Sequence, residues 1–120
     1  MFYACVARRT VILAEHAQES STVASAAKRV LERLPARDGK VSYTQDQYVY
    51  HIVVDQGITF LCVADDSFGR GVPYAFLQDI EERFFQAYGG TAQAALPYAF
   101  NDEFARVIAQ KVCWLPFFPP

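Results

Sequence analysis

The residues that could support catalysis or metal binding are few and lie far apart in the sequence. They are His16, His51, Cys5, Cys62, Cys113, the pair Asp65-Asp66 and the pair Glu81-Glu82. A zinc site or an activated nucleophile needs several such groups at defined spacing. Both histidines fall in apolar, strand-like stretches, where a histidine more often makes a hydrogen bond in or near the core than binds a metal. We therefore predict no catalytic residue, no cofactor site and no metal site, and we do not expect an enzyme.

The other polar motifs have equally ordinary interpretations. Cys62, in the middle of an apolar strand, is expected to be a small core residue rather than a nucleophile. The Asp65-Asp66 pair lacks the spaced acids of a calcium loop and is interpreted as a solvated turn. Gly69-Arg70-Gly71 lacks the rest of a phosphate loop. Glu81-Glu82 is predicted to lie on a solvated helix face.

Composition is typical of one folded domain that does not bind nucleic acid. The chain has 120 residues, 52% of them hydrophobic and 15% aromatic, which is enough for a single hydrophobic core. The net charge is -2 and the basic residues form no run, so nucleic acid is excluded as a partner. No apolar run reaches the roughly 18 to 20 residues of a membrane span, and no secretory signal begins the chain. Three unclustered cysteines fit a reducing cytosol.

Residues 48–65 have the pattern around which the other elements must be arranged. Two strands, 48–54 and 58–64, are apolar on both alternating faces and are separated by the short turn Asp55-Gln56-Gly57. An open antiparallel sheet normally has one wet face, so a hairpin with two dry faces needs cover on both. We therefore expect additional strands beside it and helices on each side.

The remaining segments supply those elements. Residues 2–7 and 11–16 are predicted strands around a polar turn, and 41–45 is a shorter, more polar strand expected at a sheet edge. Apolar residues at helical spacing predict three amphipathic helices. Their stripes are Val23, Ala27, Val30, Leu31 and Leu34; then Phe76, Leu77, Ile80 and Phe84; then Phe104, Val107, Ile108 and Val112. Asn101 is the predicted N-cap of the third helix.

Residues 1–112 are therefore expected to form one domain, followed by an apolar, proline-rich tail at 113–120. The tail contains too much proline to continue a helix. It is expected either to pack on a surface or to be a foreign end.

Six short strings of residues, distributed through about residues 2–112, carry a family resemblance. The strings are Phe2-Tyr3-Ala4-Cys5-Val6-Ala7-Arg8, Thr10-Val11-Ile12-Leu13-Ala14-Glu15, Tyr43-Thr44-Gln45-Asp46-Gln47-Tyr48, Thr59-Phe60-Leu61-Cys62-Val63-Ala64-Asp65-Asp66, Phe68-Gly69-Arg70 with Val72-Pro73, and Tyr98-Ala99-Phe100-Asn101-Asp102-Glu103-Phe104. In the same order, they resemble the longin domain of longin-type vesicle-associated membrane proteins, the R-SNAREs. The resemblance is greatest to the tetanus-insensitive group, especially its plant-type members.

The resemblance implies an α+β, profilin-like longin fold. In that fold a five-stranded antiparallel sheet carries one helix on one face and two on the other, in the order strand, strand, helix, three strands, helix, helix. It also implies a non-enzymatic domain that binds a SNARE motif or a trafficking adaptor and so controls vesicle fusion and sorting. The expected location is the cytosolic face of endosomal, vacuolar or secretory membranes.

Family members bind partners in a hydrophobic groove between the first helix and the third strand. The matching positions are Val41 and Tyr43, with Leu31 and Leu34 of the helix as neighbours. An edge strand beside an amphipathic helix offers unpaired backbone groups next to apolar side chains, which suits a peptide. The residues alone favour the simpler interpretation that Val41 and Tyr43 pack under the helix, and the resemblance favours the groove.

Two departures from the family pattern keep a second function open. These 120 residues contain neither the heptad-patterned segment with a central Arg nor the membrane anchor of an R-SNARE, and Arg9 stands in a turn where relatives often have Gly. The alternative is a stand-alone longin-like subunit of a coat adaptor or tethering complex. A permanent subunit should expose an apolar patch, whereas a switchable module is expected to be a monomer.

Overall fold

The computed structural model describes residues 3–17, 21–35, 37–45 and 48–114, and it confirms the predicted α+β longin-like fold. The strands are β1 (Tyr3–Arg8), β2 (Val11–Ala17), β3 (Gly39–Gln45), β4 (Tyr48–Asp55) and β5 (Ile58–Asp65). The helices are α1 (Ser21–Arg33), α2 (Gly71–Tyr88) and α3 (Asn101–Trp114), with short 3-10 turns η1 (Asp66–Phe68) and η2 (Ala92–Ala94). The element order is the predicted one.

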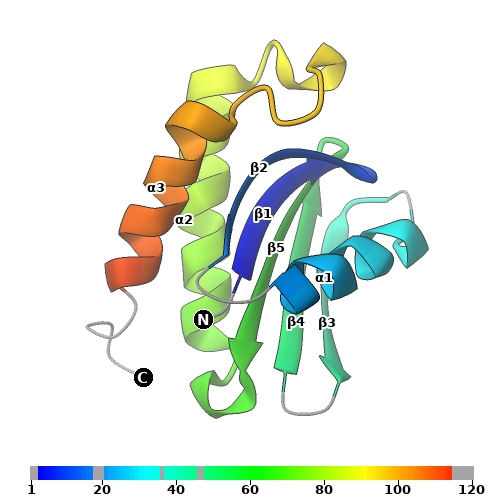
Figure 1. Ribbon diagram of the computed structural model, residues 1–120, viewed down its shortest axis with the longest axis vertical. Helices are drawn as coiled ribbons and strands as arrows, with labels where there is room; N and C mark the ends of the chain where they lie inside the picture. Colours follow the sequence, from blue (N-terminus) through cyan, green and yellow to red (C-terminus); the bar gives the residue numbers. More distant parts are fainter. Residues whose placement is uncertain (1–2, 18–20, 36, 46–47, 115–120) are drawn as a thin grey trace.

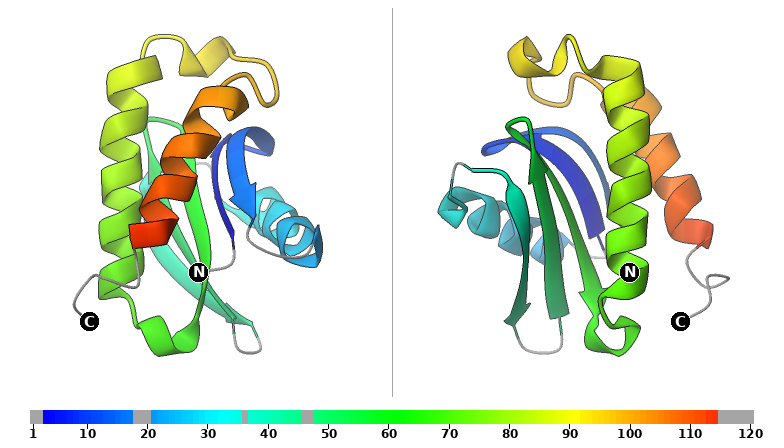
Figure 2. Two further views of the ribbon diagram at one scale, coloured as in Figure 1. Left: turned by 60° about the vertical axis from the view of Figure 1, so that its left-hand side comes forward. Right: turned by 180° about the vertical axis from the view of Figure 1, so that it is seen from behind.

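The five strands form one antiparallel sheet in the order β2-β1-β5-β4-β3. Helix α1 covers one face, and α2 and α3 lie together on the other (Figures 1 and 2). Strand β5 lies in the centre and β3 at one edge, as its polar sequence predicts.

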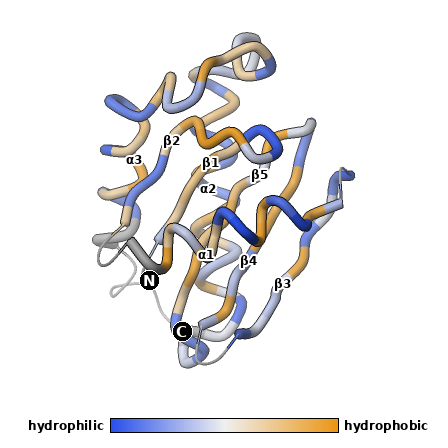
Figure 3. The backbone as a smooth tube through the Cα atoms, turned by 45° about the vertical axis from the view of Figure 1, so that its right-hand side comes forward, coloured by the Kyte–Doolittle hydropathy of each residue, from blue (hydrophilic) through white to orange (hydrophobic). Residues whose placement is uncertain are grey.

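Both faces of the central strands are buried, because residues of opposite parity enter two separate cores. Tyr50, Ile52, Leu61 and Val63 pack beneath α1. Val53, Ile58, Phe60 and Cys62 pack beneath α2 and α3. Hydrophobic residues run along β1 and β5 in the middle of the sheet, while hydrophilic residues are frequent on α1 and β3 (Figure 3). The prediction of two dry faces is confirmed.

The helices bury most of the predicted stripe residues that the structure describes. Helix α1 ends at Arg33, so Leu34 lies just beyond it, and the side chain of Val112 lies outside the described residues. The two ends of α3 also differ from the prediction. Helix α3 continues to Trp114, two residues beyond the boundary expected after Val112, because the first proline after the start of α3 is Pro116. Residues 115–120 of the predicted tail lie outside the described residues. The prediction of Asn101 as an N-cap was wrong: α3 begins at Asn101, whose Oδ1 accepts a hydrogen bond from the Glu15 backbone N–H of β2, 3.0 Å away.

The connection between α2 and α3 covers the outer edge of β2. The backbone N–H groups of Tyr98 and Phe100 donate to the carbonyls of Ile12 and Leu13, at 2.7 and 3.1 Å. Arg8 holds the start of the same connection, because its Nη1 donates to the Ala92 and Ala95 carbonyls, both at 2.8 Å. Within the described residues, one sheet edge is thus occupied by backbone hydrogen bonds, whereas no strand pairs with the outer side of β3.

The β4–β5 and β1–β2 hairpin turns both use residues at positive φ. In the β4–β5 turn, Gln56 and Gly57 have φ of 54° and 77°, the pattern of a type I′ turn, which confirms the expectation for Gly57. In the β1–β2 turn, Arg9 has φ of 57°. A non-glycine residue in this left-handed region is strained, since its Cβ crowds the backbone.

The prediction of a solvated helix face holds for Glu82 but was wrong for Glu81. Glu81 is half-buried against β4, where burial and then a hydrogen bond with the Asp55 carboxyl raise its pKa to about 7, while Lys40 opposes the shift. Two carboxyl groups sharing a partly dry site cannot both ionise easily. Glu81 therefore connects α2 to the side of the sheet where β3 and β4 lie.

The Arg9→Gly variant is predicted to be more stable than the wild type. Relief of left-handed strain at this turn should outweigh the extra freedom that glycine gives the unfolded chain, for a gain of about 0.5–1 kcal/mol. The gain corresponds to a rise in Tm of about 2–4 °C in thermal unfolding. Thr10→Gly is the matched control, because Thr10 is not at positive φ. Equal effects of the two substitutions would contradict the assignment of strain to Arg9.

The Glu81→Gln variant is predicted to gain stability over the wild type as the pH rises. Because the pKa of Glu81 is raised by folding, the wild type loses stability between the unfolded-state value of about 4.5 and a pH above 7. Glutamine keeps the neutral, hydrogen-bonding form at every pH. Urea unfolding at pH 5 and pH 8 should show near-equal stability at pH 5 and a more stable variant at pH 8. Glu82→Gln, on the exposed face, should show no such difference.

Candidate functional site

A groove lies between helix α1 and the edge strand β3. It consists of two hollows of about 310 and 280 Å³, which adjoin because Leu34 and Tyr43 line both. We call it the α1–β3 groove. The residues lining one half are Val30, Arg33, Leu34, Tyr43, Thr44, Gln45 and Tyr50. Those lining the other half are Leu34, Pro35, Arg37, Asp38, Gly39, Lys40, Val41, Tyr43 and Val54.

Three of the four predicted partner-binding residues line this groove. Val41 lines one half, and Leu34 and Tyr43 lie where the halves meet. Tyr43 is 43% exposed, so it does not simply pack under the helix. Leu31 is almost fully buried in the core beneath α1 and lines a different, neighbouring hollow. The edge strand therefore places an exposed aromatic ring and an aliphatic floor side by side.

Sequence analysis missed several groove residues. Val30 was assigned to the apolar stripe of the first helix and Arg33 was not assigned to the site, yet both line the groove next to Leu34. The sequence signal that could have identified them is their spacing, four residues and one residue before Leu34. Residues at that spacing lie at the boundary between the two faces of an amphipathic helix. Tyr50 could have been identified from the register of the β3–β4 hairpin, because it is the cross-strand partner of Tyr43.

The charges around the groove are mostly positive. Arg33 lines the half next to Thr44 and Gln45, while Arg37 and Lys40 line the half next to Val41. Among the described lining residues the acidic one is Asp38, whose Oδ2 accepts a hydrogen bond from the Gln56 backbone N–H, 3.2 Å away. The Lys40 ammonium lies over the Tyr74 ring, on the α2 side of β3, so Arg33 and Arg37 are the basic groups nearest the apolar floor.

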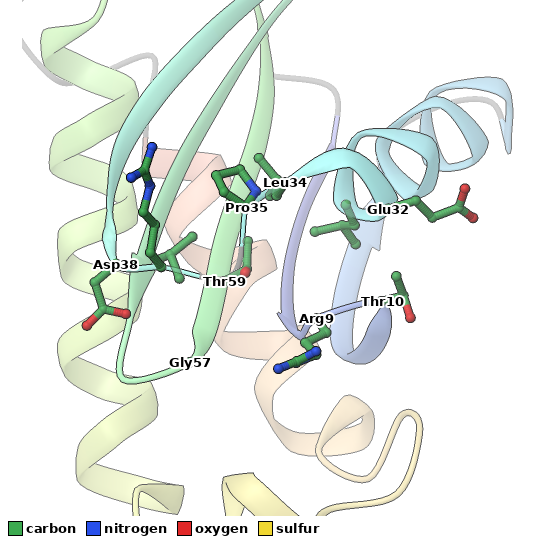
Figure 4. Close-up of a pocket in the computed structure, with 11 residues that line it drawn as sticks. Arg9, Thr10, Glu32, Leu34, Pro35, Asp38, Gly57 and Thr59 are labelled. Carbon is green, nitrogen blue, oxygen red and sulfur yellow. The ribbon is translucent and has the colours of Figure 1, made fainter.

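The neighbouring hollow is more polar. It has a volume of about 430 Å³ and lies between the end of α1 and the turns of both hairpins (Figure 4). Arg9, Thr10 and Gly57 line it from the turns, Glu32 lines it from the end of α1, and Leu34 lines it from the residue after that helix. Its lining charges are Arg9, Glu32, Arg37 and Asp38, which are balanced in sign. Nothing in this charge set favours one class of ligand.

A hydrogen-bonded cluster lies on the opposite face of β3. Ser42 Oγ is 2.9 Å from His51 Nδ1 and 2.8 Å from the Tyr74 hydroxyl, so β3, β4 and α2 are joined. His51 is fully buried, as expected of a core histidine. Burial, and secondarily Arg70, lowers the pKa of His51 below its ordinary value, which keeps the imidazole neutral at pH 7. His51 Nε2 makes no hydrogen bond within the described structure.

The remaining candidate residues show no catalytic arrangement. Cys62 is fully buried and burial raises its pKa, which leaves an unreactive thiol, as predicted. Asp65 accepts a hydrogen bond from the Ser67 backbone N–H in the predicted turn. In the described part of the chain, no three His, Cys, Asp or Glu residues are placed to hold a metal ion. None of the helices described here is long and apolar enough to cross a bilayer.

Comparison with known proteins agrees with this architecture. The longin family, described as a Regulated-SNARE-like domain, matches residues 13–108. Vesicle-associated membrane protein 711 of Arabidopsis thaliana is 45% identical over 113 residues, which cover 93% of this chain and 52% of that protein. Vesicle-associated membrane protein 712 of the same plant is 46% identical over 113 residues, with the same coverage.

A more distant relative is vesicle-associated membrane protein 7 of Mus musculus, which is 37% identical over 112 residues, covering 93% of this chain and 51% of that protein. The chain spans about half the length of the curated relatives that it matches. The profile match, the identities and the fold agree, and the chain belongs to the longin family of Regulated-SNARE-like domains.

Proposed function

We propose that this chain is a regulatory longin module that binds a SNARE motif or a trafficking adaptor in the α1–β3 groove and thereby controls vesicle fusion and sorting. The observation that carries the proposal is the groove itself, where the half-exposed Tyr43 lies beside Leu34 and Val41 on an open edge strand. The role is binding rather than catalysis. Its expected place is the cytosolic face of endosomal, vacuolar or secretory membranes.

The physical basis for binding is twofold. Alternate residues of an edge strand direct their backbone N–H and C=O groups away from the sheet, where an extended segment can pair with them. Tyrosine adds a large contact area at low entropic cost and a hydroxyl group that hydrogen-bonds at the rim. A partner that covers Tyr43 can pair with the backbone of β3 and contact the tyrosine ring at the same time.

The alternative of a permanent subunit of a coat or tethering complex has less support. Among the described residues, the large hydrophobic side chains classed as exposed are Tyr43, Leu96 and Tyr98. Tyr43 lies on β3, whereas the other two lie in the α2–α3 connection, at the far end of the sheet (Figure 1). They form no continuous apolar patch of the kind that a permanent interface needs. We therefore expect a monomer.

The Tyr43→Ala variant tests the proposed function. Because Tyr43 is 43% exposed, its truncation should change Tm by no more than a few degrees. Loss of an anchoring aromatic residue should weaken binding of the SNARE-motif segment of a longin-type R-SNARE by about tenfold. Amide shifts in an NMR titration measure the affinity and the location, with shifts expected on β3 and α1.

Leu96→Ala is the control, because Leu96 is 76% exposed and lies outside the groove. It should bind as the wild type does. Unfolding of Tyr43→Ala, or unchanged affinity with shifts elsewhere, would count against the groove as the binding site. An adaptor fragment in place of the SNARE motif distinguishes the two partner classes.

A further inference from the structure

The hollow between the end of α1 and the two hairpin turns lies over a part of the sheet that α1 does not cover. Its volume of about 430 Å³ is within the range of small-molecule sites in proteins. Helix α1 ends at Arg33, and Val54 and Thr59, a cross-strand pair near the β4–β5 turn, line the hollow from the sheet. Their side chains face α1, because they have the parity of the strand residues in the core beneath it. The proposed function makes no use of this hollow.

Thr59 places an unpaired hydroxyl group at the base of the hollow. The residue is only 5% exposed, and its side chain makes no hydrogen bond with any residue that the structure describes. A hydroxyl group so well shielded from solvent normally has a partner, because an unpaired buried donor costs free energy. Leu31 and Val54 line the same hollow with aliphatic groups. The base therefore offers one hydrogen-bonding group on an apolar floor.

Arg9 brings a positive charge to the same place. It lies two residues beyond Ala7, the cross-strand partner of Thr59, so the Cα atoms of Arg9 and Thr59 are roughly 8 Å apart. The guanidinium group extends across the hollow toward Gly57 (Figure 4). Arg9 is exposed, and no described residue makes an ion pair or hydrogen bond with its side chain. A small ligand can therefore contact the Thr59 hydroxyl and the Arg9 guanidinium at once.

The backbone conformation of Arg9 supports a role for its side chain. Its φ of 57° costs free energy for a residue with a Cβ, whereas glycine adopts this conformation freely. Strained residues of this kind cluster at ligand sites. Because glycine relieves the strain, the Arg9→Gly variant removes the guanidinium group without destabilising the fold. Loss of binding in that variant cannot then be attributed to unfolding.

The four lining charges cancel in sum but differ in direction. The carboxylates of Glu32 and Asp38 point outward on opposite sides of the hollow, whereas the Arg9 guanidinium points into it (Figure 4). Asp38 is also engaged, since its Oδ2 accepts the hydrogen bond from the Gln56 backbone N–H. The interior thus favours one negative charge beside Arg9. A second negative charge on the same ligand would be repelled by the two carboxylates at the rim, which favours a monoanion over a dianion.

We propose that this hollow binds a small carboxylic acid with an apolar body. Its carboxylate accepts hydrogen bonds from the Arg9 guanidinium and the Thr59 hydroxyl, and its body packs on Leu31, Leu34 and Val54. A carboxylate matches the planar guanidinium group through two parallel hydrogen bonds. At about 30 Å³ for each atom with its share of free space, the volume holds roughly a dozen non-hydrogen atoms. This site is additional to the α1–β3 groove of the proposed function.

The test is an NMR titration of the 120-residue chain with three probes that share one apolar body. They are 4-phenylbutyrate, which is anionic, 4-phenylbutanamide, which is neutral, and 4-phenylbutylamine, which is cationic. The carboxylate should bind roughly tenfold more tightly than the amide, and the amine should bind least. The largest amide shifts should fall on Thr10, Gly57 and Thr59, which line the hollow.

Two variants assign the binding groups. Arg9→Gly and Thr59→Val should each weaken binding of the carboxylate roughly five- to tenfold, while Arg9→Gly should leave binding of the neutral amide unchanged. Valine keeps the shape of threonine and removes only the hydroxyl group. Arg106→Ala is the control, because Arg106 is exposed on α3 and does not line the hollow. It should bind as the wild type does, and circular dichroism checks that each variant is folded.

Several outcomes would overturn the inference. They are equal affinities for the carboxylate and the amide, unchanged binding by Arg9→Gly, and no shifts with any probe at about 10 mM, where ligands of this size are detected. Tighter binding of phenyl phosphate than of the carboxylate would contradict the preference for a monoanion. Loss of probe binding in Tyr43→Ala would place the probe in the α1–β3 groove instead. None of these results bears on whether a SNARE motif or an adaptor binds that groove, so the proposed function is tested separately.

Discussion

The need to cover both faces of the central strands determines the layout of this domain. Strands β1, β4 and β5 bury apolar side chains on either side, and three helices are available to cover them. Two helices pack on one face, so the other has α1 alone. Helix α1 has 13 residues and is therefore about 20 Å long. The sheet beneath it has five strands and is about 24 Å wide, counting roughly 4.8 Å for each strand. Cover on this side is therefore incomplete, and the α1–β3 groove lies where it is missing.

The two edges of the sheet differ in whether other segments cover them. The α2–α3 connection donates backbone hydrogen bonds to β2, and Arg8 holds that connection in place. On the other side, the described structure holds β3 from behind, through β4 and the Ser42–His51–Tyr74 cluster. A strand that is held from behind but open in front has a fixed position and a free binding edge. Rigidity of that kind reduces the entropy lost when a partner binds.

Most of the fold could be predicted because local patterns determine it. Alternation in residues 48–65 implied two dry faces, and helical spacing implied three stripes, most of whose described residues pack in the two cores. Contacts between distant segments could not be predicted in this way. The side chain of Asn101 accepts a hydrogen bond from Glu15 in β2, which lies 86 residues earlier in the chain. Glu81 contacts Asp55 only because α2 packs on the sheet. Leu31 and Leu34 looked equivalent in sequence, and only the position of α1 over the sheet separates a core residue from a groove residue.

The covered edge of β2 also limits how copies of this domain can associate. Pairing between sheets needs an open strand on each partner, and in the described structure β3 is open while the hydrogen bonds of Tyr98 and Phe100 occupy β2. Two copies joined through β3 would leave no open strand for a third, so such pairing ends at a closed dimer and cannot grow into a fibre. A domain with a single open edge is thereby protected from open-ended aggregation.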